Sequence, residues 1–393
     1  MFKIFLLKGG LDNIDGIFCD GINCGLKPNN QLDLAFIRSE DISNIAAIYT
    51  TNKFQAAPIK HALSYGKVFE GNFILMNSKN ANAMTGEEGI RDIEEILETL
   101  PIDAKNPIMS STGVIGYRLP KEKIINGLQK FNFNAKNSNN AANAILTTDS
   151  FKKEIAIEVE VKNEGKFKIA AIAKGAGMIN PAMATMLCFI VTDANIPKDE
   201  MLPLLQEAAD ESFNRISVDG DRSTNDTVIL MSNKKSNFYN KEAFRYALKY
   251  ISFELAMMIL RDGEGANKVV AFEVVGAKDN IEAKRVAKNL SNSLLVKTAL
   301  FGEDPNWGRI ASTIGASDVE CDEDKLKIYY DDLLIYDKDH KELDKEREEK
   351  AYKIMKKDSF KIRCDLGVGD GEYIAYGCDL SYEYVKINAE YRT

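Results

Sequence analysis

The chain has 393 residues, of which 45% are hydrophobic and 28% are charged, and its formal net charge is −8 at pH 7. This length allows a large core and two or three domains, and the composition is that of an ordinary globular protein. The acidic balance argues against nucleic acid as the main partner, because phosphate binding needs a basic surface.

No part of the sequence resembles an export signal or a membrane span. The N-terminal stretch MFKIFLLKGGLDN is too short for the apolar region of a signal peptide and lacks a small-residue cleavage site. No window approaches the run of about 18 apolar residues that spans a bilayer. The six cysteines are scattered and form no CxxC motif. We therefore expect a cytoplasmic protein with reduced thiols and no membrane partner.

The middle of the chain begins with an expected β-hairpin. Apolar and polar residues alternate from Ile155 to Val161 and again from Phe167, and an Asn-Glu-Gly turn joins the two halves. The second strand runs into Lys174 and a glycine-rich bend, after which MLCFIVTDA indicates a fully buried strand.

Helices and further strands follow in separate blocks. Helical spacing of apolar residues predicts helices over 197–214, 242–260, 281–300 and 342–357. NDTVILMSN and KVVAFEVVGA are typical of strands, and the last hundred residues indicate mostly short strands, including a strand-like tail at KINAEYRT. Because strands come in hairpins and helices in blocks, we expect an α+β fold of layered sheets covered by helices.

Histidine is rare, which restricts the possible chemistry. The chain holds only His61 and His340. Two histidines leave little possibility of a Ser-His-Asp triad, a Cys-His pair or a histidine-rich metal site. We therefore expect no metal.

Thr185 is the hydroxyl residue between the glycine bend and the buried strand, in KGAGMINPAMATMLCFIVTDA. A β-branched residue suits a strand, and on composition alone this is the simpler interpretation. The alternative is a nucleophile whose base is its own α-amine, which requires cleavage of the Ala184–Thr185 bond. An α-amine titrates at a pH of about 7.7–8.0, which suits a proton acceptor.

Three other segments have competing interpretations. The glycines near Lys174 match no phosphate-binding motif. SVDGDRSTNDTV lacks the glycine and glutamate of a calcium loop, so we interpret it as a polar turn network. In SSTGVIG, Thr112 and Gly113 offer a hydroxyl beside a backbone N–H, as an oxyanion hole requires, although such a segment alone is more often a turn. Trp307, the single tryptophan, is expected to pack at a corner of the fold.

Eight segments taken together resemble the ornithine acetyltransferase family, over about residues 20–393. They are YTTNKFQAAPI, NSKNANAMTGEEG, SSTGVIG, KGAGMINPAMATML, SVDGDRSTNDTV, DGEGANK, DPNWGRI and INAEYRT. The stretch PAMATML is highly specific to that family, whereas the shorter segments are weak individually. Two positions depart from the expected pattern, Lys79 and Arg222.

The resemblance implies an N-terminal-nucleophile-like fold and a self-cleaving enzyme. Cleavage at Ala184–Thr185 would give an α chain, 1–184, and a β chain, 185–393. Within the β chain we expect 185–280 to complete the main sandwich and 281–393 to form a smaller subdomain. The fragments are expected to associate as a heterotetramer with two copies of each.

The resemblance also assigns the chemistry. Thr185 would take acetyl from N²-acetylornithine and pass it to glutamate, and Thr112 with Gly113 would form the oxyanion hole. The matched substrate-binding positions are Thr148, Lys174, Thr185, Glu264, Asn388 and Thr393. No cofactor is implied, and acetyl-CoA stays open as a second donor.

Two rival interpretations remain at this point. One is an N-terminal-nucleophile aminopeptidase or amidohydrolase of the same fold, in which water accepts the acyl group. The other is a non-catalytic small-molecule binding protein whose chain stays uncut.

Overall fold

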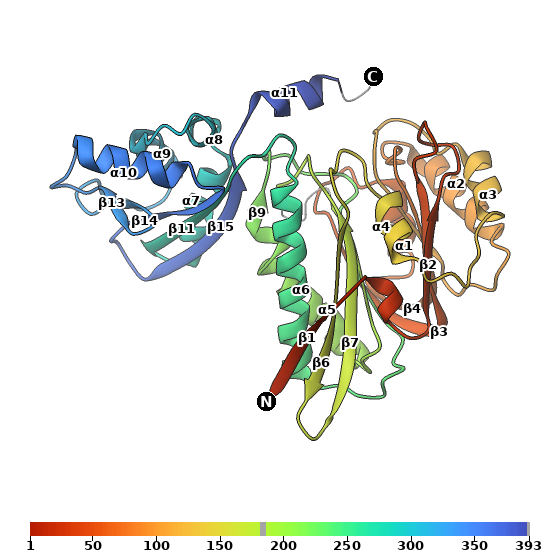
Figure 1. Ribbon diagram of the computed structural model, residues 1–393. Helices are drawn as coiled ribbons and strands as arrows, with labels where there is room; N and C mark the ends of the chain where they lie inside the picture. Colours follow the sequence, from red (N-terminus) through yellow and green to blue (C-terminus); the bar gives the residue numbers. More distant parts are fainter. Residues whose placement is uncertain (181–185, 391–393) are drawn as a thin grey trace. The chain divides into compact units, whose positions relative to one another are not determined.

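The computed structural model describes residues 1–180 and 186–390 (Figure 1). These residues form two compact units. The described residues of the first unit are 1–178, 186–214 and 221–259, and those of the second are 179–180, 215–220 and 260–390. Each unit contains a mixed sheet with helices packed on it, so the expected α+β class is confirmed.

The first unit is built on a nine-stranded sheet in the order β1-β6-β7-β8-β10-β3-β4-β5, with β2 paired to β3. The strands are β1 (Phe2–Leu7), β2 (Ile17–Ile22), β3 (Leu34–Tyr49), β4 (Val68–Asn77), β5 (Ile108–Ser111), β6 (Lys153–Val161), β7 (Gly165–Lys174), β8 (Leu187–Thr192) and β10 (Thr227–Ser232). The expected hairpin is β6–β7, paired from Lys153↔Ala173 to Val161↔Gly165. The buried strand after Thr185 is β8, which lies between β7 and β10.

Helices cover this sheet and bury its central strands. They are α1 (Ala57–Leu63), α2 (Gly86–Glu98), α3 (Lys121–Leu128), α4 (Ser138–Ala144), α5 (Lys198–Asp210) and α6 (Lys241–Arg261). One core packs α1 and α4 on alternate residues of β7, β8 and β10, including Ile172 and Phe189. Phe167, on the opposite face of β7, contacts Phe244 of α6 at 5.5 Å between ring centroids. Because both faces are covered, every residue of β8 is buried and its sequence shows no alternation.

The second unit has a six-stranded sheet in the order β13-β12-β14-β11-β15-β9. Its strands are β9 (Ile216–Ser217), β11 (Val269–Ala277), β12 (Lys327–Tyr330), β13 (Leu333–Tyr336), β14 (Ser359–Asp365) and β15 (Gly371–Cys378). Its helices are α7 (Asn280–Asn292), α8 (Leu294–Phe301), α9 (Trp307–Gly315), α10 (Lys345–Met355) and α11 (Tyr382–Ala389). Trp307 begins α9 and stacks on Tyr336 at 4.2 Å between ring centroids.

Two expectations about the second half of the chain were wrong. The helix over 281–300 is interrupted at Ser293, whose extended backbone and side-chain oxygen cap α8. The C-terminal tail is the helix α11 and not a strand; none of its residues is buried, so no apolar periodicity marks it. Residues 260–390 form the long continuous part of the second unit, in which β11 pairs with β14 and β15.

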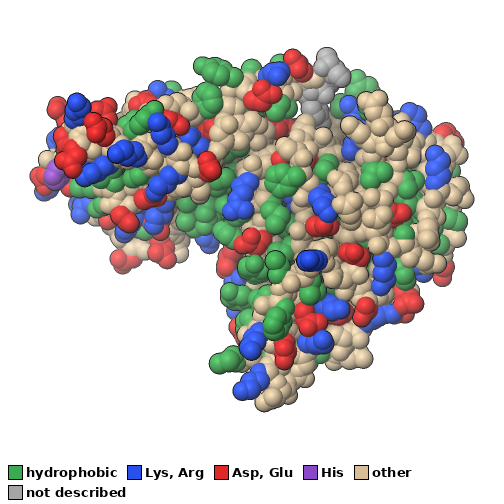
Figure 2. Space-filling model, viewed as in Figure 1, with side chains coloured by type: hydrophobic (Ala, Val, Ile, Leu, Met, Phe, Trp, Pro, Cys, Tyr) green, Lys and Arg blue, Asp and Glu red, His purple; other side chains and the backbone are tan. Residues whose placement is uncertain are grey.

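Charged side chains of both signs are interspersed on the face shown in Figure 2, without a large basic patch there. No helix among residues 1–180 and 186–390 is long and apolar enough to cross a bilayer.

Candidate active site

The first predicted site residue, Lys174, is buried at the end of β7. Its Nζ donates to Thr147 Oγ1 at 2.7 Å and lies 3.4 Å from Asp149 Oδ2. Asp149 also binds Lys153 Nζ at 2.7 Å. Burial alone would raise the pKa of Asp149, but Lys174 and Lys153 lower it below its usual range. The carboxylate is therefore ionised and fixes the ammonium of Lys174.

Thr148 lies in the same turn, between two residues that contact Lys174. It is half-buried, and the neighbouring Thr147 N–H donates to Asp149 Oδ2 at 3.0 Å. Lys27 Nζ reaches this turn from another loop and donates to Leu146 O at 2.6 Å. Burial and, to a smaller extent, the charge of Lys174 lower the pKa of Lys27 to about 8, although Asp33 partly offsets them. Two lysines therefore surround this turn, a suitable environment for a carboxylate ligand.

The predicted oxyanion residues Thr112 and Gly113 follow β5. The Thr112 N–H donates to Asn77 O at 3.0 Å. Gly113 has φ +135, and a Cβ there would lie 2.1 Å from the carbonyl carbon of Lys79, so this position needs glycine. Within the described part of the chain, neither the Gly113 N–H nor the Thr112 hydroxyl has a hydrogen-bond partner. Two donors at successive residues are thus available to a ligand.

The turn that precedes β10 connects this loop to the start of β8. Asn225 Nδ2 donates to Ser111 O at 2.9 Å and to Ala81 O at 2.6 Å. The next residue, Asp226, accepts the Met186 N–H at 3.1 Å through Oδ1. Both side chains are buried. The polar turn network expected for SVDGDRSTNDTV is therefore present. Its neighbouring residues Asn225 and Asp226 bind Ser111, which precedes Thr112, and Met186, which follows Thr185.

Asp226 is a buried carboxyl group with unusual electrostatics. Its Oδ2 forms no hydrogen bond of good geometry with the described residues. Burial raises the pKa of Asp226 well above its usual value, and the nearby Met186 N–H and Thr50 and Ser223 hydroxyls only partly offset this. The neutral, protonated form of Asp226 is therefore favoured over a wider pH range in the folded protein than in the unfolded chain.

The ends of three neighbouring strands bring Lys174 close to Met186. Lys174 of β7 pairs with Leu187 of β8, and Leu187 pairs with Thr227 of β10. Thr185 is two residues before Leu187 in the sequence. Thr185 itself, Ala184 and Thr393 lie outside the described residues, so their predicted roles stay predictions.

The remaining predicted residues, Glu264 and Asn388, belong to the second unit and contact each other there. Asn388 Nδ2 of α11 donates to Glu264 Oε2 at 2.7 Å. Gly265 has φ +67, and a Cβ there would lie 2.6 Å from Ser381 Oγ and from Tyr384 N, so α11 packs tightly on this loop. These two segments, distant in sequence, therefore contact each other in the second unit, and their predicted binding role stays a prediction.

The two departures from the family pattern have different surroundings. Lys79 has φ +74 and its carbonyl accepts the Val114 N–H at 3.1 Å, so its backbone shapes the Thr112 loop. The Lys79 charge also lowers the pKa of Lys27. Arg222 is exposed, and its carbonyl accepts from Asn52 Nδ2 at 3.0 Å.

A model of the ArgJ family matches residues 18–393. The chain belongs to the ArgJ family. It is 56% identical over 396 residues to the arginine biosynthesis bifunctional protein ArgJ of Wolinella succinogenes, and the match covers both chains completely. It is 40% identical over 407 residues to a glutamate N-acetyltransferase of Methanothermobacter thermautotrophicus, covering all of this chain and 99% of that one. Among solved structures, an ArgJ protein of Bacillus halodurans is 40% identical, with a TM-score of 0.47, over 50% of this chain and 95% of that chain.

Membership of the ArgJ family confirms the resemblance read from the motifs. The chain is an acyltransferase of arginine biosynthesis. No group of three His, Cys, Asp or Glu side chains within 1–180 and 186–390 is arranged to hold a metal ion.

Three residues that shape this ArgJ site were not predicted as site residues: Asp149, and Asn225 and Asp226 of the expected turn network. Asp149 follows Thr148 directly, and the other two precede a fully buried strand. An acid or amide residue next to an apolar strand can indicate a supporting residue of a site, because a polar side chain that is buried there needs a specific hydrogen-bond or charge partner.

Asp149 and Asp226 should respond oppositely to the same isosteric substitution. Asp149→Asn should lower the free energy of unfolding at pH 7 by about 3–5 kcal/mol, because it leaves buried lysines without their partner. The pKa of Asp149 is depressed in the folded state, so this stability is present above the unfolded pKa and is lost as pH falls through the folded one.

Asp226→Asn should leave stability unchanged or raise it at pH 7. The folded protein holds a proton that the unfolded chain releases above a pH of about 3.9, so the wild type loses stability as pH rises toward the folded pKa. Denaturant titrations of both variants between about pH 4 and 8 test this. Equal destabilisation by the two substitutions at pH 7 would contradict the assigned charge states.

Proposed function

We propose that the chain is a glutamate N-acetyltransferase that moves acetyl from N²-acetylornithine to glutamate through an acetyl ester on Thr185. The proposal rests on two donors, at Thr112 and Gly113, that have no partner among residues 1–180 and 186–390. Their loop is tied through Asn225 and Asp226 to Met186, the residue after Thr185. The named activities of the relatives give the same reaction class.

The first half-reaction transfers the acetyl group to the enzyme. Thr185 Oγ1 attacks the acetyl carbon, and its proton passes to the α-amine that self-cleavage has freed. The oxyanion takes hydrogen bonds from Thr112 and Gly113. The C–N bond then breaks, and the proton goes to the nitrogen of the departing ornithine.

The second half-reaction reverses these steps with glutamate. Its amine attacks the acetyl ester, and the oxyanion forms at the same donors. The α-amine of Thr185 takes a proton from the attacking nitrogen and passes it to Thr185 Oγ1 as the ester C–O bond breaks. Both amides have similar energy, so the transfer needs no external energy source. By charge alone, Lys174 suits a role in attracting the substrate carboxylate, and Glu264 suits a role in attracting an ammonium group.

The α-amine of Thr185 is the proposed base because neither histidine suits that role. His61 is buried, its pKa is lowered by burial, and its ring packs against Tyr65. His340 is exposed and its Nδ1 lies 2.8 Å from Asp337 Oδ1, in the second unit. Substituting both by glutamine should leave the reaction intact.

Incubation with N²-acetylornithine alone should release ornithine in a burst equal to the enzyme concentration and add one acetyl group to the fragment that begins with Thr185. Ping-pong kinetics should accompany it, with parallel double-reciprocal lines for donor and acceptor. Quenched-flow measurement and intact-mass spectrometry provide the two readouts. Intersecting lines together with no acetylated fragment would indicate direct transfer between the substrates.

The same assay separates the alternatives for donor and acceptor. Acetyl-CoA in place of N²-acetylornithine tests whether the enzyme is bifunctional, as the names of several relatives state for those proteins. Continued acetate release without glutamate would identify an amidohydrolase, whereas a single burst followed by a stop identifies a transferase. We further propose a cytoplasmic enzyme without a cofactor, assembled as a heterotetramer of cleaved chains.

A further inference from the structure

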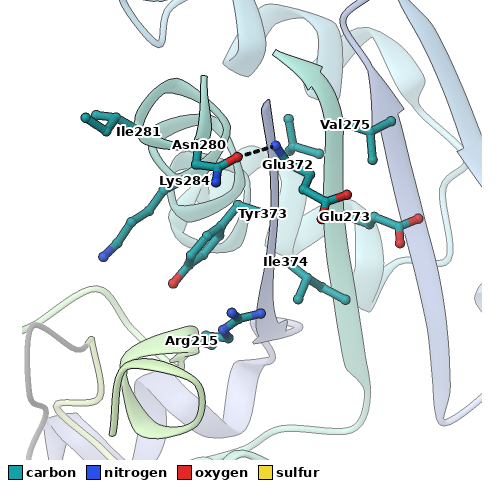
Figure 3. A pocket seen from close by; sticks show the side chains of 10 residues that line it. Arg215, Glu273, Val275, Asn280, Ile281, Lys284, Glu372, Tyr373 and Ile374 are labelled. Carbon is teal, nitrogen blue, oxygen red and sulfur yellow. Dashed lines mark hydrogen bonds between the residues drawn. The ribbon is translucent and has the colours of Figure 1, made fainter. Parts of the chain in front are cut away.

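A cavity lies in the second unit, between the start of α7 and the strands β11 and β15 (Figure 3). We call it the α7 cavity. Its volume is about 740 Å³, within the range of small-molecule sites. Its walls carry six polar or aromatic side chains, Arg215, Glu273, Asn280, Lys284, Glu372 and Tyr373. None of these is among the residues matched to the acetyl-transfer site.

Two cations meet at Tyr373 on one side of the α7 cavity. The guanidinium of Arg215 lies 5.0 Å and Lys284 Nζ lies 5.6 Å from the centre of the Tyr373 ring. Figure 3 shows these three side chains together and Glu273 and Glu372 on the other side of the view. Like charges repel, so their approach to one ring creates a positive potential that favours an anion.

Neither cation is paired with a carboxylate inside the described ranges. The Arg215 Nε is buried and has no hydrogen-bond partner there, and Lys284 forms no ion pair. The guanidinium of Arg215 therefore keeps an uncompensated positive charge at the cavity wall. A bidentate carboxylate or phosphate group fits that fork.

The acidic side of the cavity does not cancel this field. Glu273 is paired with Lys361 Nζ at 2.9 Å and lies 3.6 Å from Arg363 Nε. Lys288, one turn after Lys284 on α7, does not line the cavity; its Nζ donates to Ile216 O at 3.2 Å. Burial and the charge of Lys284 lower the pKa of Lys288 to about 7. Only Glu372, which is exposed, brings an uncompensated negative charge to the wall.

We propose that the α7 cavity binds a small organic anion, with Arg215 and Lys284 holding its phosphate or carboxylate group against Tyr373. The apolar side chains of Ile281, Val275 and Ile374 line the same cavity and suit the carbon body of such a ligand. The residues of the α7 cavity differ from those predicted for acetyl transfer. Anion binding in the α7 cavity can therefore be tested independently of the proposed reaction.

Calorimetric titration of the full-length protein tests the proposal. Pyrophosphate serves as the phosphate probe and citrate as the carboxylate probe, both at constant ionic strength set with NaCl. One saturable site per chain is expected for at least one probe, and the stronger of the two identifies the ligand chemistry. No saturable binding of either probe up to about 10 mM, a concentration that corresponds to very weak affinity, would overturn the proposal.

Three variants separate a specific site from general charge attraction. Lys284→Gln removes an exposed side chain and should weaken binding about tenfold or more, as should Arg215→Gln. Lys278→Gln is the matched control, because Lys278 is exposed just before α7 but does not line the cavity. Equal weakening in all three would mean non-specific attraction, and unchanged binding in Lys284→Gln would place the anion elsewhere. Lys284→Arg should restore most of the affinity.

Discussion

Thr185→Ala should yield a protein that stays as one chain and transfers no measurable acetyl group. The substitution removes the only oxygen of this side chain, so neither attack on the Ala184 carbonyl nor formation of an acetyl ester can occur. The wild type should give a second fragment whose N-terminal sequence reads TMLCF. A denaturing gel, N-terminal sequencing and the burst assay measure these outcomes.

Thr185→Ser provides the matched control for this variant. Serine keeps a hydroxyl and loses only a methyl group, so cleavage and acetyl transfer should both persist, at lower rates. Unfolding curves should show all three proteins folded, because Met186 and Leu187 keep their contacts with Asp226 and Lys174 in each of them. Wild-type protein that is active while its chain remains intact would refute the proposed base.

Thr112→Ala should lower kcat by about 10²–10³, the usual consequence of removing one oxyanion donor, with a smaller change in KM. The Thr112 N–H still donates to Asn77 O in this variant, so the loop itself should persist. Thr112→Ser should retain most of the rate because it retains the hydroxyl. A kcat within a few-fold of the wild type in Thr112→Ala would make Thr112 a turn residue only.

The Gly113 contribution needs a different comparison, since its donor is a backbone N–H. Gly113→Ala should displace that N–H and reduce kcat strongly, because the new Cβ would lie 2.1 Å from the Lys79 carbonyl carbon. Gly116→Ala is the matched control. Gly116 also has a positive φ, +94, but a Cβ there meets no atom within 4 Å. Both variants carry backbone strain, so a difference in kcat between them measures the displaced donor.

The sequence alone predicted the α+β class, the β6–β7 hairpin and the buried strand β8. Those features depend on the alternation of neighbouring residues and on turn chemistry, which are local. The family motifs predicted Thr112, Gly113 and Lys174 as site residues, and the structure places all three in the first unit. The scarcity of histidine in the sequence also favoured an N-terminal α-amine as the base for a threonine nucleophile.

Tertiary structure alone decided which polar residues support those site residues. Asn225 and Asp226 are far in sequence from Ser111 and Met186, and only the sheet order β8-β10-β3-β4-β5 brings their segments together. The ionisation of Asp149 and Asp226 also differs for a tertiary reason. Both carboxyls are buried, but Lys153 and Lys174 reach only Asp149 closely enough to bond with it. Charge state depends on burial and on distant partners, and the local sequence specifies neither.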